Sequence, residues 1–281
     1  MIADSTGPAA SLDAVRLRAA LCVGPGGTAR QATIWNDVRI VASTGSTNTD
    51  VLRFAAAGAP EGLVLATESQ TAGKGRQGRV WQTRPGTALT FSVLLRPDPV
   101  PQPARGWLPL LAGVAVVHAL GQVSGLDARL KWPNDVLVGQ RKLAGILAEQ
   151  AAGTVVVGIG VNLLGGERDL PVPSATSLER CGAAGSDRTS LLAAILAELE
   201  HWYLRWRETG DAEAAGLRKE YLSLSATIGQ QVRVQLPGDR ALTGLASGVD
   251  GAGQLLVEPA PGREAVAISA GDVIHVRAAD H

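Results

Sequence analysis

The chain has 281 residues, of which 46% are hydrophobic and 19% are charged. That length predicts one large domain, or one large domain with a small appendage. Its 26 basic residues balance its 26 acidic ones, so no net field attracts nucleic acid or an anionic membrane. Any anion must therefore be bound by a local cluster of charge.

Cysteine use and the apolar segments predict a cytoplasmic protein. The two cysteines, Cys22 and Cys181, are too sparse for a disulfide framework. The N-terminal segment lacks a charged stretch followed by an unbroken apolar one, so we expect no signal peptide. The apolar run at 108–123 is short and is interrupted by His118 and Gln122, which favours a buried core helix over a membrane span.

The predicted elements begin with a loose tail. In chain order, the N-terminal part is expected to hold a tail at 1–10, a helix at 12–22, a Gly/Pro-rich break at 24–27 and a strand near 33–41. Ser46, Thr47 and Asn48 are all good N-cap residues, and Thr47 with Asp50 has the spacing of a capping box. We therefore expect a helix from there to about residue 57, ended by Gly58.

Strands and helices then follow each other closely. The expected elements are a strand at 62–68, a polar glycine-rich loop at 69–80, a strand at 88–96, a helix at 105–122, strands at 128–132, 135–139, 142–150 and 154–164, and helices at 189–207 and 212–223. From about residue 226 the pattern becomes short strands separated by turn sequences, which is typical of a small β-barrel. The chain therefore reads as α+β, with a tail and short helix over 1–30, a main domain over 31–225 and a β-domain over 226–281.

The loop Gln70–Trp81 carries three glycines in the spacing G-x-G-x-x-G. In a dinucleotide-binding fold this pattern must open a helix, but here Pro85 and Gly86 follow it. It also lacks the Lys-Ser/Thr pair of a P-loop. What remains is a flexible cationic loop that can approach a phosphate or carboxylate, although a solvated basic loop has the same composition.

A second polar cluster, Lys131-Trp132-Pro133-Asn134-Asp135, follows a predicted strand. Asp135 is a candidate ligand for Mg²⁺, Asn134 for a purine edge and Lys131 for a phosphate. By itself, Pro-Asn-Asp also forms an ordinary β-turn.

Two later segments have both a binding and a structural interpretation. Lys142 enters an apolar strand, where a lysine often serves only to block edge-to-edge pairing. Gly158 and Gly160 stand in a strand before Asn162, and glycines there indicate a bulge, a tight bend or a ligand that touches the backbone.

These segments together resemble the biotin–protein ligase family. The motifs S-T-N, Q-T-A-G-K-G-R-Q-G-R-x-W, K-W-P-N-D, K-L-A-G-I-L and G-I-G-V-N occur in the family's order and spacing, from Ser46 onward. The resemblance implies a central mixed β-sheet flanked by helices, as in class II synthetases, with a C-terminal SH3-like barrel. It also implies formation of biotinyl-5'-AMP from biotin and ATP, and biotin transfer to a lysine of a biotin carboxyl carrier protein of an acyl-CoA carboxylase.

The same resemblance assigns residues to the two substrates. Biotin would be bound by Ser46, Thr47, Asn48, Gln70, Gly73, Lys74, Gly75, Arg76, Lys142, Gly158 and Gly160. ATP would be bound by Arg79, Trp81, Lys131, Asn134, Asp135 and Asn162, with Mg²⁺ at Asp135. Arg76 and Lys142 would be catalytic. Lys74 departs from the family's usual G-R-G-R, since lysine keeps the charge of arginine but loses its two-pronged hydrogen bonding.

This chemistry requires charge neutralisation and positioning, without a nucleophile from the protein. The four histidines have no metal-ligand spacing. A lipoate or octanoate ligase and a catalytically idle interaction protein are alternatives. A biotin-sensing repressor is a further one, but only about 40 residues precede Ser46 and a winged-helix domain needs roughly 60. We therefore expect no nucleic-acid or membrane partner. The oligomeric state (monomer or homodimer) and the role of the barrel (cap, or ATP or carrier docking) stay open.

Overall fold

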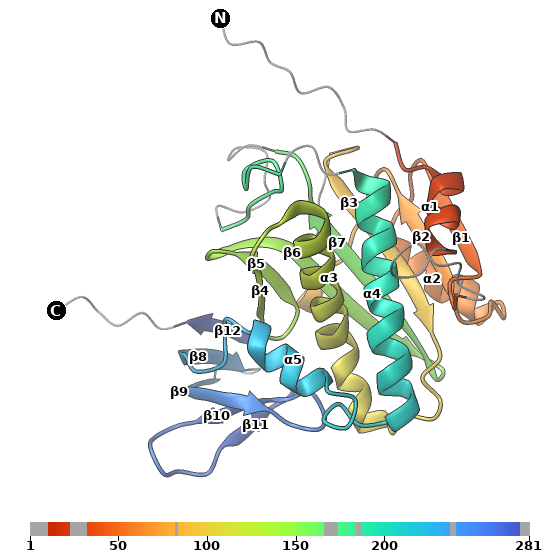
Figure 1. Cartoon of the computed structure of the whole chain (residues 1–281). Coiled ribbons are helices and arrows are strands. Elements are labelled where there is room, and N and C mark those ends of the chain that lie inside the picture. Colours follow the sequence, from red (N-terminus) through yellow and green to blue (C-terminus); the bar gives the residue numbers. More distant parts are fainter. Residues whose placement is uncertain are drawn as a thin grey trace, which may run out of the picture.

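The computed structural model describes residues 11–22, 33–81, 84–165, 174–183, 187–236 and 240–275. The predicted tail at 1–10 and the break at 24–27 lie outside these ranges. The described residues form a seven-stranded mixed sheet in the order β1-β2-β3-β7-β6-β5-β4 and a five-stranded antiparallel sheet in the order β11-β10-β9-β8-β12. The α+β prediction is confirmed, with the small sheet beside one end of the large one (Figure 1).

The observed bounds agree closely with most predicted elements. The strands of the large sheet are β1 (Asp37–Val41), β2 (Leu63–Thr67), β3 (Ala88–Leu95), β4 (Ala128–Lys131), β5 (Asp135–Val138), β6 (Arg141–Ala151) and β7 (Thr154–Asn162). The helices are α1 (Ala14–Leu21), α2 (Thr47–Ala56), α3 (Leu108–Ser124), α4 (Arg188–Thr209) and α5 (Leu217–Leu224), with short 3₁₀ turns η2 (Arg76–Gly78) and η3 (Gln102–Trp107). The small sheet contains β8 (Gln231–Leu236), β9 (Arg240–Val249), β10 (Leu255–Glu258), β11 (Val266–Ile268) and β12 (Asp272–His275).

The central strands present two different faces, because successive side chains on a strand point to opposite sides. On β3 and β7, one face carries only apolar side chains and belongs to the main core: Leu89, Phe91, Val93, Leu95, Val155, Val157, Ile159 and Val161. The other face has an apolar end, where Leu94 and Val156 pack with Val51 of α2. Further along this second face, polar residues and glycines replace the apolar ones, which leaves room for a cavity.

Helix α3 covers the apolar face of the sheet, and α4 runs beside it (Figure 1). The stretch Gln102–Ser124 is long and apolar enough to cross a membrane by length and composition alone. In the structure, α3 packs against β4 to β7, α4 and α5, and most of its side chains are buried. The segment is therefore used as a core helix, as its length and its polar interruptions predicted.

Two predicted helix starts are corrected. The N-cap of α2 is Ser46, whose hydroxyl accepts a hydrogen bond from the Thr49 amide, so the predicted cap at Thr47 is one residue late. Helix α5 begins at Leu217 instead of 212, because Gly216 adopts a left-handed conformation (φ 73°) just before it. A single turn capped by the carboxylate of Asp211 occupies the intervening residues.

Two buried tryptophans connect the large sheet's domain to the small sheet. The indole of Trp107 donates to the carbonyl of Asp250, and that of Trp132 donates to the carbonyl of Gly253. The backbone amide of Trp132 also donates to the hydroxyl of Thr227. Since both rings are almost fully buried and hydrogen-bonded, they fix the small sheet against the K-W-P-N-D turn.

Candidate functional site

A cavity of about 530 Å³ lies on the polar end of the second sheet face. Its walls come from the start of α2, the glycine-rich loop, the β4–β5 turn, strands β3, β6 and β7, and strand β12 of the small sheet. Every residue assigned to biotin or ATP lines it except Gly73. Gly73 instead packs against the far end of its own loop, where an added Cβ would come within 2.3 Å of the Trp81 carbonyl oxygen.

The α2 end of the cavity is a hydrogen-bonded network of short polar side chains. Gln70 accepts through Oε1 from the backbone amide of Thr47 at 2.8 Å, which holds the loop against the helix start. Ser92 Oγ lies 2.6 Å from Asn48 Oδ1 and 2.7 Å from Thr47 Oγ1. The amide oxygen of Asn48 can only accept, so Ser92 donates its proton to it. The Thr47 hydroxyl donates to Gln70 Oε1 at 3.1 Å, because that amide oxygen also can only accept.

Asn48 is oriented from its other side as well. Its Nδ2 donates to Glu149 Oε2 at 2.7 Å and to the carbonyl of Leu147 at 3.2 Å, both on β6. These bonds span β3, β7 and β6, so the start of α2 is tied across the sheet. The result is a preorganised end with donors and acceptors in fixed directions.

Glycines form the floor of the cavity on β7. An added Cβ on Gly158 would lie 2.2 Å from Asn48 Oδ1, and one on Gly160 would lie 2.5 Å from Trp81 Cε2. Both glycines stay in continuous register with β3 and β6, so neither a bulge nor a bend explains them. Glycine is required here because polar and aromatic side chains pack directly on the backbone.

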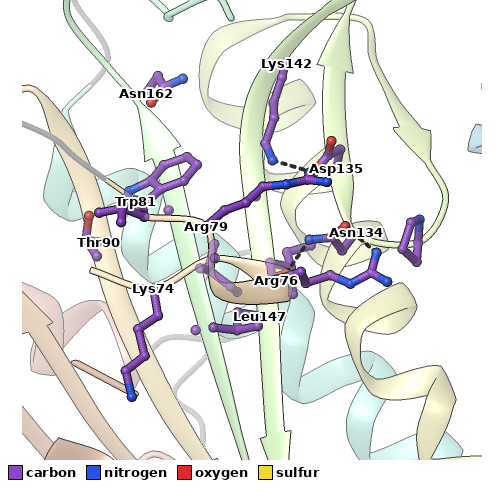
Figure 2. A pocket seen from close by; sticks show the side chains of 18 of the residues that line it. Lys74, Arg76, Arg79, Trp81, Thr90, Asn134, Asp135, Lys142, Leu147 and Asn162 are labelled. Carbon is purple, nitrogen blue, oxygen red and sulfur yellow. Dashed lines mark hydrogen bonds and ion pairs between the residues drawn. The ribbon is translucent and has the colours of Figure 1, made fainter. Parts of the chain in front are cut away.

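The glycine-rich loop folds over the floor without opening an α-helix. It closes on itself through a hydrogen bond from the Gly75 amide to the Arg79 carbonyl at 2.7 Å, around the short turn η2. Gln77 has a left-handed conformation (φ 56°) inside that turn. The loop thereby places Trp81 inward, whereas the Lys74 side chain is exposed and extends away from Arg76 (Figure 2).

The opposite end of the cavity gathers cations and one carboxylate. Arg76 donates to Asn134 Oδ1 at 3.2 Å, and Lys142 Nζ lies 2.5 Å from Asp135 Oδ1 (Figure 2). Burial lowers the pKa of the Arg76 guanidinium, against the opposing attraction of Asp272 and Asp135. The ammonium of Lys142 also lies 5.8 Å from the centre of the Trp81 ring.

Several predicted ATP residues are engaged within the protein. Asn134 Nδ2 donates to the carbonyl of Ile146 at 2.7 Å, so this amide fixes the turn onto β6. Asn162 Nδ2 donates to the carbonyl of Thr176 at 3.0 Å. Lys131 faces the cavity and contributes, after burial, to a lowered pKa at His275.

The alternative interpretation of Lys142 as an edge-strand lysine is wrong. Strand β6 lies between β5 and β7, and the Lys142 backbone pairs with the segment around Ala175. Its side chain is about two-thirds buried and turns toward the cavity. A lysine in an interior strand has no edge to protect.

Carboxylates in the cavity are few. Among the described residues, no group of three or more His, Cys, Asp or Glu side chains could hold a metal by itself. Asp135 and Asp272 are the carboxylates that line the cavity walls in the described ranges, and Asp272 is paired with Arg79. Asp135, with Lys142 on one oxygen, can therefore hold a divalent cation only together with oxygens of a substrate or of water.

Four residues of this site were not predicted from the sequence. Ser92 and Glu149 orient the α2 end, Thr90 lines the wall on β3, and Asp272 on β12 pairs with Arg79 of the loop. Two hydroxyls at Thr90 and Ser92, within a strand that is otherwise wholly apolar, are a signal that could have been used. Glu149 and Asp272 carry no local signal, since only the strand register and the small sheet bring them here.

Comparison with known proteins places these features in a family. Residues 40–165 match the biotin/lipoate A/B protein ligase family, and residues 227–276 match the biotin protein ligase C-terminal domain. A biotin–[acetyl-CoA-carboxylase] ligase of Mycobacterium tuberculosis is 42% identical over 86% of this chain and 90% of its own length. The bifunctional ligase/repressor BirA of Bacillus subtilis is 35% identical over 71% of this chain, but over only 62% of its own length.

Solved structures agree with the sequence matches. The biotin protein ligase of Aquifex aeolicus, in complex with biotin and ATP, superposes with a TM-score of 0.71. It is 26% identical, and the match covers 86% of this chain and all of that one. The fold and the small C-terminal sheet therefore both correspond to one group of proteins.

Proposed function

The chain belongs to the biotin–protein ligase family, and from its cavity we infer how this ATP-dependent biotin ligase carries out its reaction. The inference rests on one observation: the two ends of a single cavity carry different kinds of side chain. Fixed neutral donors and acceptors lie at the α2 end, and Arg76 and Lys142 lie at the other.

We assign biotin to the floor between these ends. The ureido ring of biotin offers two N–H donors and one carbonyl acceptor, which suits the network around Thr47, Asn48 and Gln70. The carboxylate of biotin then extends toward Lys142 and Arg76, where ATP brings its α-phosphate. Trp81 and Asn162 border the adjoining wall, which leaves that side for the adenosine.

The first step joins two anionic groups. A carboxylate oxygen of biotin attacks the α-phosphorus, the bond to the β-phosphate oxygen breaks, and pyrophosphate leaves with that electron pair. The ammonium of Lys142 and the guanidinium of Arg76 offset the repulsion that otherwise opposes this approach. Mg²⁺ suits Asp135 together with phosphate oxygens and water, and it would supply charge screening for the triphosphate.

The second step transfers the acyl group. The product biotinyl-5'-AMP is an activated mixed anhydride, and the loop over it excludes water until a carrier lysine enters. The lysine amine attacks the acyl carbon, the bond to the phosphate oxygen breaks, and AMP leaves. We propose the biotin carboxyl carrier domain of an acyl-CoA carboxylase as the carrier, because relatives are named for that enzyme.

The chain divides into three parts in this proposal. We assign residues 31–225 to catalysis, 226–281 to the small C-terminal domain and 1–30 to a tail with a short helix. The small domain contributes Asp272 to the cavity and so takes part in closing the loop. ATP use and the unpaired cysteines Cys22 and Cys181 support a cytoplasmic location.

Isotope exchange between pyrophosphate and ATP tests the first step. We expect exchange only when biotin is present, and little with lipoate. The variant Arg76→Ala should lose adenylation or release biotinyl-5'-AMP faster than wild type. The control Arg129→Ala removes an arginine that pairs with Asp127 outside the cavity, and it should exchange normally. Normal synthesis and retention of the adenylate by Arg76→Ala would contradict the assignment.

A further inference from the structure

Thr90 of β3 carries a buried hydroxyl that has no role in the two proposed reaction steps. Its side chain lines the cavity and is only 5% exposed. Its Oγ1 has no hydrogen-bond partner among the residues that the structure describes. A buried hydroxyl without a partner is costly, so its presence in a strand of apolar residues calls for a ligand.

The strand register places Thr90 one step from the α2 network. Across the sheet, Ser92 lies opposite Gly158 and Thr90 lies opposite Gly160. Thr90 and Ser92 point to the same face of β3, about 7 Å apart along the strand. Ser92 is hydrogen-bonded to Asn48 and Thr47, whereas Thr90 has no partner in the described ranges. The unsatisfied hydroxyl therefore lies in the row of paired residues that contains Thr90 and Gly160, and not in the row that contains Ser92 and Gly158.

A second unused donor lies over the same glycine. The indole nitrogen of Trp81 is buried and has no partner in the described part of the chain. An added Cβ on Gly160 would be 2.8 Å from that nitrogen, so the indole lies directly above the strand position that pairs with Thr90. The two side chains lie next to each other in Figure 2. Two buried donors beside one glycine indicate that the ligand brings an acceptor to this row.

The chemistry of biotin identifies that acceptor, and this step rests on the proposed binding mode. The ureido group is taken by the α2 network, and the carboxylate is taken by the cations beyond Gly145 on the far strand. The remaining polar atom of biotin is its thioether sulfur, on the opposite side of the bicyclic ring from the ureido carbonyl. Thr90 lies on the same strand as Ser92, which orients the ureido contact Asn48, and one row further along.

We propose that Thr90 donates a hydrogen bond to the thioether sulfur of biotin and so determines specificity for the sulfur-containing ring. A thioether is a weak acceptor. The net contribution of a hydrogen bond to binding is about 0.5–1.5 kcal/mol, which corresponds to a twofold to tenfold change in Kd. The assignment makes Thr90 a positioning residue for the substrate, with no part in bond making.

The test combines two protein variants with two ligands. Thr90→Val removes the hydroxyl at nearly constant shape, and Thr90→Ser keeps it. Biotin carries the sulfur, and desthiobiotin lacks it. Kd for each pair is measured by calorimetry, together with the KM for ATP and the thermal midpoint of the free protein.

We expect Thr90→Val to weaken biotin binding twofold to tenfold and to leave desthiobiotin binding and the KM for ATP unchanged. Thr90→Ser should bind biotin within about twofold of wild type. Free Thr90→Val should be as stable as wild type or more stable, because it buries no unsatisfied hydroxyl. A structural role for Thr90 predicts the reverse effect on stability.

Two results would overturn the proposal: unchanged biotin binding by Thr90→Val, or an equal loss for biotin and desthiobiotin. Failure of the proposed function has a different signature, since wild type itself would then bind no biotin. If Thr90→Val folds poorly, Thr90→Ala removes the same hydroxyl with a smaller side chain, and an equal change in Kd for biotin and desthiobiotin would again overturn the proposal.

Discussion

Replacing each glycine of the cavity floor by alanine should distinguish a contact that stabilises the fold from a contact that matters for the bound ligand. In Gly158→Ala the new Cβ would lie 2.2 Å from Asn48 Oδ1 and 2.9 Å from Asn48 Cγ. In Gly160→Ala it would lie 2.5 Å and 2.6 Å from two ring carbons of Trp81. Neither glycine has a positive φ, so the backbone accepts alanine and the effect is steric.

The two neighbours differ in how freely they can move. Asn48 is held from both sides by hydrogen bonds, so Gly158→Ala must strain the network or break it. Overpacking of about 1–3 kcal/mol, with a lost hydrogen bond of about 1 kcal/mol, predicts a Tm lower by roughly 5–10 °C. Trp81 belongs to a surface loop, so Gly160→Ala should displace the loop with a Tm change below about 2 °C.

The loss in Gly160→Ala should appear in function instead. With the loop displaced, we expect biotinyl-5'-AMP to form or to be retained at least tenfold less well, the equivalent of about 1.4 kcal/mol. Thermal melts and a filter assay of retained adenylate measure the two effects. The control Gly121→Ala, in open space on α3, should gain about 1 kcal/mol in stability and keep full activity. Equal Tm losses in both floor variants, or wild-type retention by Gly160→Ala, would refute this reasoning.

Three further changes test other parts of the site and core. Lys142→Met should lower biotin-dependent pyrophosphate exchange about 10²–10³-fold with little change in Tm, and near-normal exchange would remove its role. Asp272→Ala frees Arg79 and should speed adenylate release up to about fivefold and increase trypsin cleavage of the loop, whereas an unchanged loop would mean that this ion pair closes nothing. The bond to Glu198 raises the pKa of His118, so its stabilisation is present below the unfolded pKa of histidine and is lost as pH rises through the folded pKa. His118→Gln should therefore lower the free energy of unfolding by about 1 kcal/mol at pH 6 and by less at pH 9, and a pH-independent loss in urea titrations would contradict this.

The local pattern of apolar and polar residues was sufficient to predict most helices and strands of the fold. The run of β3, apolar except for Thr90 and Ser92, and the β-branched run of β7 both became central strands, buried on both faces. The apolar segment at 108–123 became the core helix α3, most of whose side chains are buried, and His118 lies at its edge between the carboxylates of Glu198 and Glu220. The helix starts were less predictable, since Ser46 and Thr47 can both cap a helix in a peptide.

What decides between those caps is a contact far away in the sequence. Thr47 is drawn into the helix because its hydroxyl and amide face Ser92 and Gln70. The same limit applies to the site, where the motifs predicted the residues that line the cavity but not those that orient them. Glu149 reaches Asn48 only through the register of β6, and Asp272 reaches the loop only because the small sheet packs beside it.

The central claim is that one cavity makes biotinyl-5'-AMP, keeps it from water and passes it to a lysine. A single-turnover experiment with biotin and α-labelled ATP tests this directly, with the carrier domain added after the adenylate has formed. We predict that label stays with the enzyme as biotinyl-5'-AMP and leaves as AMP when the carrier is added, in equal amount to the biotin transferred. A carrier whose target lysine is replaced by arginine should release none. Label that fails to depend on biotin, or that leaves at the same rate with and without the lysine, would contradict the account.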